Sequence, residues 1–183
     1  MSEKPILFSG EMVRAILSGK KTQTCRLLKP QPKERFFFFN TEREPKTFAA
    51  KNADYHSPYF KGDVLYVRET WGIDESAFEQ KYVYRATDPE WQTRQDGFKW
   101  HPSIHMPKDA ARIFLKVKAV DCLRLSCLTD RQIKAEGIEG DSELVRLAKF
   151  QCLWDSCYGD GASMLNPVVW RIEFERIEKG EPR

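Results

Sequence analysis

Leu17-Ser18-Gly19-Lys20-Lys21-Thr22-Gln23-Thr24-Cys25-Arg26 is the stretch around which the fold is interpreted, with two lysines, two threonines and an arginine in its last seven residues. Gly19 predicts the end of a helix. Residues 22–28 are then predicted to be extended, with Thr22, Thr24 and Arg26 on one face and Lys21 in the bend. Charge runs are usually solvated, so one interpretation is a basic turn. The other is a small-ligand site in which Lys21 and Thr24 converge.

The segment before this stretch predicts a strand and a helix. Residues 5–8 are a short apolar run typical of a buried strand. Ser9 is a suitable N-cap, and Glu11 suits the first helical turn. The apolar residues that follow recur at helical spacing, and they are Met12, Val13, Ile16 and Leu17.

Two insertions are predicted, at about residues 30–62 and 86–109. The first contains four prolines, and it sets Lys33 and Arg35 beside phenylalanines at 36–39. That run suits either a base-stacking platform or an edge strand buried against the core. Between the insertions, residues 64–70 and 81–86 are predicted strands. Arg68 and Glu69 then point to opposite faces of the first, so one of them faces a site or a less solvated side.

The last third of the chain is predicted to hold a strand, two helices and a final strand. Residues 111–120 predict a half-buried strand, and Thr129 to Gln132 match a capping box that opens a short helix ending at Gly137. Glu136 falls in the last turn, where the helix dipole disfavours a carboxylate, which suggests another role. A longer helix from Asp141-Ser142 to Gly159 precedes a final strand at residues 168–175. The predicted core stripe of this helix is Leu144, Val145, Ala148, Cys152 and Trp154.

This order of elements favours an α+β fold. Helices do not alternate regularly with strands, which argues against a parallel doubly wound sheet. A small mixed β-barrel with helices packed on the outside accounts for five or six short strands. We expect one domain over residues 1–183, carrying the two insertions.

Composition narrows the function classes. The chain has 183 residues, a net charge of +3 and 41% hydrophobic residues, without an apolar run long enough for a membrane helix. No secretory signal is recognised, so a cytoplasmic location is expected. Between Arg14 and Arg35 there are seven basic residues against one acidic residue. Such a patch favours an anionic partner, here single-stranded RNA, a loop or a nucleotide.

Neither a metal nor another cofactor is predicted. The five cysteines are expected to be reduced thiols, and their spacing favours core packing over a zinc site. His101 and His105 have a spacing that could bind a metal on a helix, but Pro102 and Pro107 argue against a regular helix there. Turn packing is the preferred interpretation. The oligomeric state is not predicted.

The sequence resembles the ASCH domain, a PUA-like β-barrel, and its longer form is similar to ASCH proteins of bacteriophages and prophages. The motifs that carry the resemblance are residues 18–26, Pro5 to Gly10, Gly62 to Val67, Arg68 to Trp71, Pro102 to Pro107, Asn166-Pro167 and Trp170 to Phe174. This family implies binding of RNA or of a modified nucleoside in the barrel cleft.

One branch of that family, the small bacterial N4-acetylcytidine amidohydrolases, uses a threonine, a lysine and a glutamate. Lys21 and Thr24 match its motif with the same spacing, and Glu136 is the candidate carboxylate. The resemblance therefore implies Thr24 as nucleophile, Lys21 as base and Glu136 as their partner. The residues expected to bind the substrate, a modified cytosine nucleoside, are Lys20, Arg26, Arg68 and Glu69.

The chemistry of these residue types agrees with that expectation. A hydroxyl with a neighbouring base can open an acylated cytosine amide through an acyl-enzyme. An unperturbed lysine is almost wholly charged at neutral pH, so a base role requires burial or a cationic neighbour such as Lys20 or Arg26. Glu136 would orient Lys21, or carry a proton to the leaving nitrogen. The alternatives are a noncatalytic RNA-binding module and an RNA-cleaving protein.

Overall fold

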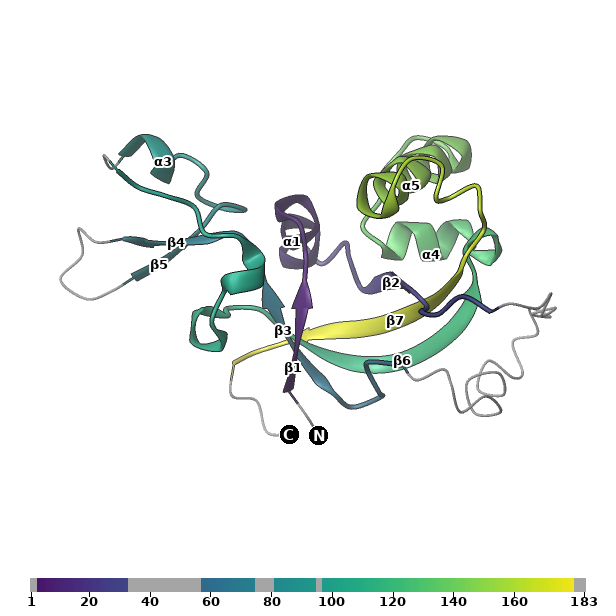
Figure 1. Ribbon diagram of the computed structural model, residues 1–183, viewed down its shortest axis with the longest axis horizontal. Helices are drawn as coiled ribbons and strands as arrows, with labels where there is room; N and C mark the ends of the chain where they lie inside the picture. Colours follow the sequence, from purple (N-terminus) through teal and green to yellow (C-terminus); the bar gives the residue numbers. More distant parts are fainter. Residues whose placement is uncertain (1–2, 33–56, 75–80, 95–96, 180–183) are drawn as a thin grey trace. The chain divides into compact units, whose positions relative to one another are not determined.

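The computed structural model describes residues 3–32, 57–74, 81–94 and 97–179 (Figure 1). It confirms the α+β class, with mixed parallel and antiparallel strand pairing. Closure of the sheet into a barrel stays a prediction. The chain divides into two compact units, and each is described by itself. The first comprises residues 1–19, 62–116 and 175–183, and the second comprises residues 20–61 and 117–174.

The first unit holds a parallel strand pair and the first helix. Strand β1 (Glu3–Leu7) pairs in parallel with β3 (Val64–Arg68), which pairs antiparallel with the start of β6 (Phe114–Arg124). Helix α1 (Gly10–Leu17) begins at the predicted N-cap, where the Ser9 hydroxyl accepts a hydrogen bond from a backbone N–H. It ends before Gly19, whose φ of 75° favours glycine. The predicted helix is confirmed.

The first unit also holds a hairpin and several short helices. The hairpin pairs β4 (Trp71–Asp74) with β5 (Lys81–Tyr84), and only β5 was predicted from the sequence. The short helices are α3 (Trp91–Arg94), η1 (Ser103–His105) and η2 (Lys108–Ala110). The His101 ring packs 4.8 Å from the Trp71 ring, centroid to centroid. His101 therefore packs against the hairpin, as the turn-packing interpretation expects.

In the second unit two helices cover one side of an antiparallel sheet (Figure 1). Strand β7 (Val168–Ile177) lies between β6 and β2 (Gln23–Leu27), with Gln23 opposite Glu173 and Leu27 opposite Val169. After β6 come η3 (Leu125–Cys127), α4 (Asp130–Ala135) and α5 (Glu143–Tyr158).

The core beneath α5 corrects the predicted stripe. Phe150 and Trp154 are buried and pack with Ile133 and Val169. Of the five residues predicted for the stripe, only Trp154 is buried, and the exposed ones are Leu144, Val145, Ala148 and Cys152. Helix α5 carries apolar residues on two faces, and the face with the aromatic side chains buries more area per residue. The larger aromatic face determines which side of α5 meets the sheet.

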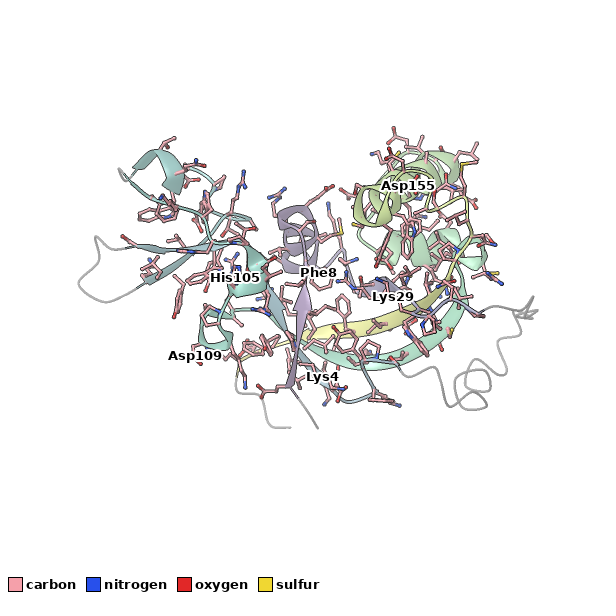
Figure 2. All side chains as sticks on the ribbon, in the orientation of Figure 1. Lys4, Phe8, Lys29, His105, Asp109 and Asp155 are labelled. Atoms are coloured by element: carbon pink, nitrogen blue, oxygen red, sulfur yellow. The ribbon has the colours of Figure 1, made fainter. Side chains whose placement is uncertain are left out.

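The loop after α5 is attached to the helix by a side chain. Asp155, labelled in Figure 2, accepts hydrogen bonds from the backbone N–H of Ser163 at 2.7 Å and from its hydroxyl at 3.1 Å. Gly159 ends the helix with a φ of 106°, as predicted.

Within the described residues, no helix combines the length and apolarity that crossing a membrane requires.

Candidate functional site

Helix α4 places Glu136 where the chain leaves the helix. Thr129 and Gln132 form the predicted capping box at its start. At its end Glu136 is the C-cap residue, and Gly137 follows with a φ of 85°. A right-handed helix requires negative φ, so the helix ends where the chain takes this conformation, which glycine adopts without strain. The prediction that Glu136 lies in the last turn, just before Gly137, is confirmed at the level of the backbone.

Lys21 and Glu136, 115 residues apart in sequence, meet in the second unit. Lys21 Nζ donates hydrogen bonds to Glu136 Oε2 at 2.6 Å and to the Glu136 backbone oxygen at 2.9 Å. Their backbones form an isolated antiparallel bridge, and the Thr22 N–H donates to the Ala135 carbonyl at 2.9 Å. Lys21 is 3% exposed and Glu136 is 4% exposed. Lysine and glutamate are almost never buried unless paired, so each side chain accounts for the other.

Gln23 extends this pair, and sequence reasoning missed it. Its Nε2 lies 3.4 Å from Glu136 Oε1 and 3.3 Å from the Gln132 carbonyl oxygen. Its Oε1 accepts a hydrogen bond from Arg171 Nη1 at 3.4 Å. The period of two in an extended chain puts residues 21, 23 and 25 on one face, and that was the available signal.

Cys25 lies on the same face of the extended chain as Lys21 and Gln23. Its thiol is buried, and burial raises its pKa well above the usual value; the nearby Glu136 charge adds to this effect. The thiol is therefore protonated at neutral pH. Core packing, predicted for the cysteines, is confirmed for Cys25 and Cys122. It is wrong for Cys152 and Cys157, which are exposed on α5.

Thr24 lies on the other face of β2. It is 3% exposed and alternates with Lys21, Gln23 and Cys25 along the extended chain. Among the described residues, its hydroxyl makes no hydrogen bond to Lys21 or Glu136. The structure thus brings Lys21 and Glu136 together, and within the described residues no hydrogen bond joins Thr24 to either of them.

The expected substrate-binding residues near this stretch have different surroundings. Lys20 forms an exposed salt bridge with Glu139, with Lys20 Nζ 2.7 Å from Glu139 Oε1. Arg26 is half-buried on the Thr24 face of β2. Lys29, labelled in Figure 2, follows β2 and is exposed. Lys33, Arg35 and the phenylalanines at 36–39 lie outside the described residues.

Arg68 and Glu69 belong to the first unit and have partners there. Glu69 is 1% exposed, and both of its carboxylate oxygens accept hydrogen bonds from Arg112, at 2.9 and 3.0 Å. The Arg112 guanidinium also stacks 3.9 Å from the centre of the Tyr84 ring. Arg68 donates to the backbone carbonyls of Met106 and Ile104. Glu69 is thus the residue that faces the less solvated side, and substrate binding by either one stays a prediction.

The described residues contain no group of three or more histidine, cysteine, aspartate or glutamate side chains arranged to hold a metal ion.

The sequence matches no protein-family model and no curated protein. Among solved structures, it is similar to an ASCH domain from Lactobacillus crispatus JV V101, with 12% identity over 97% of this chain and 81% of that chain and a TM-score of 0.48. It is also similar to protein EF3133 from Enterococcus faecalis V583, with 11% identity over 100% and 84% of the two chains and a TM-score of 0.42.

Proposed function

We propose that this protein is an amidohydrolase that removes the acyl group from N4-acylated cytosine nucleosides. Lys21 and Glu136 are its proton-transferring pair, and Thr24 is its nucleophile. The observation that carries the proposal is the buried 2.6 Å contact between Lys21 Nζ and Glu136 Oε2. The choice of substrate rests on the sequence motif, in which a lysine and a threonine stand three residues apart.

The Lys21–Glu136 pair suits proton transfer. Moving one proton along the hydrogen bond from Nζ to Oε2 converts an ammonium and a carboxylate into an amine and a carboxylic acid. The net charge of the pair does not change. The transfer exchanges two buried charges, each of which burial penalises, for two neutral groups. The amine is then a base, and the carboxylic acid is a proton donor.

The reaction follows in two stages. The Lys21 amine takes the Thr24 hydroxyl proton as Thr24 Oγ1 attacks the acyl carbonyl carbon. The bond from that carbon to cytosine N4 breaks, and N4 receives a proton from the pair and leaves as the free amine of cytidine. Water then attacks the acyl carbon of the acyl-threonine ester and gives one proton to the pair. The bond from that carbon to Thr24 Oγ1 breaks, and the pair returns the proton to Oγ1. A carboxylic acid and the free Thr24 hydroxyl result.

The role of Thr24 rests on its spacing from Lys21 and on its burial. Because residues three apart in an extended chain point to opposite sides, direct proton transfer from Thr24 to Lys21 requires the chain from Lys21 to Thr24 to rearrange when substrate binds. Catalytic hydrogen bonds are often long or misaligned before substrate binds, which is consistent with this requirement. A water molecule activated by Lys21 is the competing nucleophile.

The decisive experiment follows cytidine formation from N4-acetylcytidine by absorbance. Wild type is expected to turn over, Thr24→Ala to lose turnover, and Thr24→Ser to retain part of it. Thr22→Ala is the matched control, because Thr22 is an exposed threonine of the same segment. Mass spectrometry of rapidly quenched enzyme should find one acetyl group on the peptide that contains Thr24.

Three outcomes test the proposal and the separate roles of Thr24 and Lys21. Absence of turnover by wild type contradicts the proposal as a whole. Full activity of Thr24→Ala with inactive Lys21→Met replaces threonine by water as nucleophile and retains the proton-transferring pair. If both variants remain active, neither residue takes part in the reaction.

The competing function is noncatalytic binding of single-stranded RNA by the basic segment. Lys20 and Lys29 are both exposed, one before and one after β2. Binding by phosphate contacts weakens as salt rises. A protein that retains labelled single-stranded RNA in a salt-dependent way, loses it in Lys29→Glu, and shows no turnover would fit this alternative. Metal-dependent degradation of the RNA would instead indicate cleavage.

A further inference from the structure

Gln23 is a buried polar residue that the reaction steps above do not use. It is 2% exposed, lies two residues after Lys21 on the same face, and contacts both Glu136 and Arg171. We propose that Gln23 is a positioning residue, which fixes the Glu136 carboxylate for proton exchange with Lys21. This inference rests on the proposed function.

The surroundings of Gln23 determine which way its amide points. Arginine can only donate hydrogen bonds, so the amide atom facing Arg171 Nη1 must be the oxygen. The amide nitrogen then faces the Gln132 carbonyl oxygen and Glu136 Oε1, and both of these accept. A flipped amide would place N–H groups against Arg171 and an oxygen against two oxygens. Only one orientation of the Gln23 amide satisfies its neighbours.

The Glu136 carboxylate is consequently held at both oxygens. Oε2 accepts from Lys21 and Oε1 accepts from Gln23, so rotation of the carboxylate would break at least one contact. Proton exchange along a hydrogen bond depends on its distance and alignment. Without the Gln23 donor, Oε1 would lose a hydrogen bond in a buried site, where leaving an acceptor unsatisfied is costly.

Arg171 holds Gln23 in turn. On β7, the Arg171 guanidinium forms salt bridges with Asp121 of β6 and with Glu173, the latter at 2.6 Å between Nη1 and Oε1. Its backbone pairs with Cys25 in the β2–β7 ladder. These salt bridges, to residues of two strands, hold the Arg171 guanidinium in place. The Gln23 amide connects this guanidinium to the Glu136 carboxylate.

Gln23→Met tests this role by removing the amide at similar length. The kcat should fall about 10-fold or more, from the loss of one hydrogen bond to a charged group, while KM changes less than about 2-fold. Gln31→Met is the matched control, since among the described residues the Gln31 amide bonds only to the backbone of Leu28 and Val168. It should leave kcat unchanged. Equal losses of kcat in the two variants would overturn the assignment.

Gln23→Glu adds a readout that lost packing would not produce. It keeps an acceptor toward Arg171 but turns the donor toward Glu136 into a second carboxylate oxygen. A protonated carboxyl can donate again, so the activity of this variant relative to wild type should rise from pH 8 to pH 5. The charged groups around the position are already net negative, and they are Lys21, Glu136, Arg171, Asp121 and Glu173. A ratio that does not change with pH would contradict the proposal.

Thermal unfolding separates this inference from the proposed function. The Tm of Gln23→Glu should fall further below that of wild type at pH 8 than at pH 5, whether or not any substrate is turned over. If wild type has no activity, the proposed function fails, and with it the catalytic purpose of Gln23. The Tm comparison then decides whether Gln23 holds the Glu136 carboxylate: a difference that is constant with pH excludes that contact as well.

Discussion

Lys21 Nζ lies 2.6 Å from Glu136 Oε2, with both side chains buried against the end of α4. Either change, Glu136→Gln or Lys21→Met, leaves one charge buried without its partner. We expect each single variant to lower the free energy of unfolding by about 3–5 kcal/mol. Urea unfolding measures this loss.

A double variant isolates the interaction itself. Lys21→Met combined with Glu136→Met removes both charges, and apolar replacement of a buried pair is often close to neutral. The double variant should therefore be more stable than the sum of the two single losses allows. Strict additivity of the single variants would show that the two charges do not interact.

The packing of α5 is tested by a pair of substitutions on its two faces. Phe150→Ala removes a buried ring that packs near Trp154, and it should cost about 3–5 kcal/mol. Leu144→Ala removes a side chain that is 77% exposed, and it should change stability by less than about 0.5 kcal/mol. Comparable losses from both would contradict the assignment of the aromatic face alone as the side of α5 that packs on the sheet.

The stability contributed by the contact between Asp130 of α4 and Arg146 of α5 should depend on pH. Hydrogen bonds from Arg146, and then from Lys134, lower the pKa of Asp130 from 3.8 to about 2. A lowered carboxyl pKa stabilises the fold above the unfolded pKa, and this contribution is lost as pH falls from about 4 to about 2. The Tm difference between wild type and Asp130→Asn should be full at pH 7 and shrink over that range. A difference that stays constant down to pH 2 would count against the pair.

Thiol reactivity should follow burial. Cys152 and Cys157 are exposed and should react with a thiol reagent in the native protein. Cys25 is buried, and burial raises the pKa of its thiol, so it should react only after unfolding. Peptide mapping of the labelled sites checks this order. Rapid labelling of Cys25 in the native state would contradict the position of β2 beneath α4.

Sequence reasoning predicted the elements whose ends are chemically marked. Ser9, Gly19, Thr129 and Gly137 have capping or conformational properties that depend on few neighbours, and the structure places them at helix ends. Glu136 was found because its position before Gly137 is a local property. That the helix end meets the start of β2 required the structure.

What the sequence did not reveal depends on long-range contacts. A buried glutamine such as Gln23 has no local signature, because its partners come from α4 and β7. The stripe on α5 was misassigned because two of its faces are apolar, and only packing on the sheet distinguishes them. Hairpin strand β4 was missed because it is four residues long and contains Gly72.

The central claim is that the buried Lys21–Glu136 pair transfers protons during deacylation of N4-acylcytosine nucleosides. The most direct measurement is kcat on N4-acetylcytidine for wild type, Glu136→Gln and Thr22→Ala, each shown to be folded at the assay temperature. Thr22→Ala, which truncates an exposed neighbour of Lys21, is expected to retain kcat, and Glu136→Gln is expected to lose it by about 100-fold or more. Turnover by folded Glu136→Gln at the wild-type rate would contradict the claim.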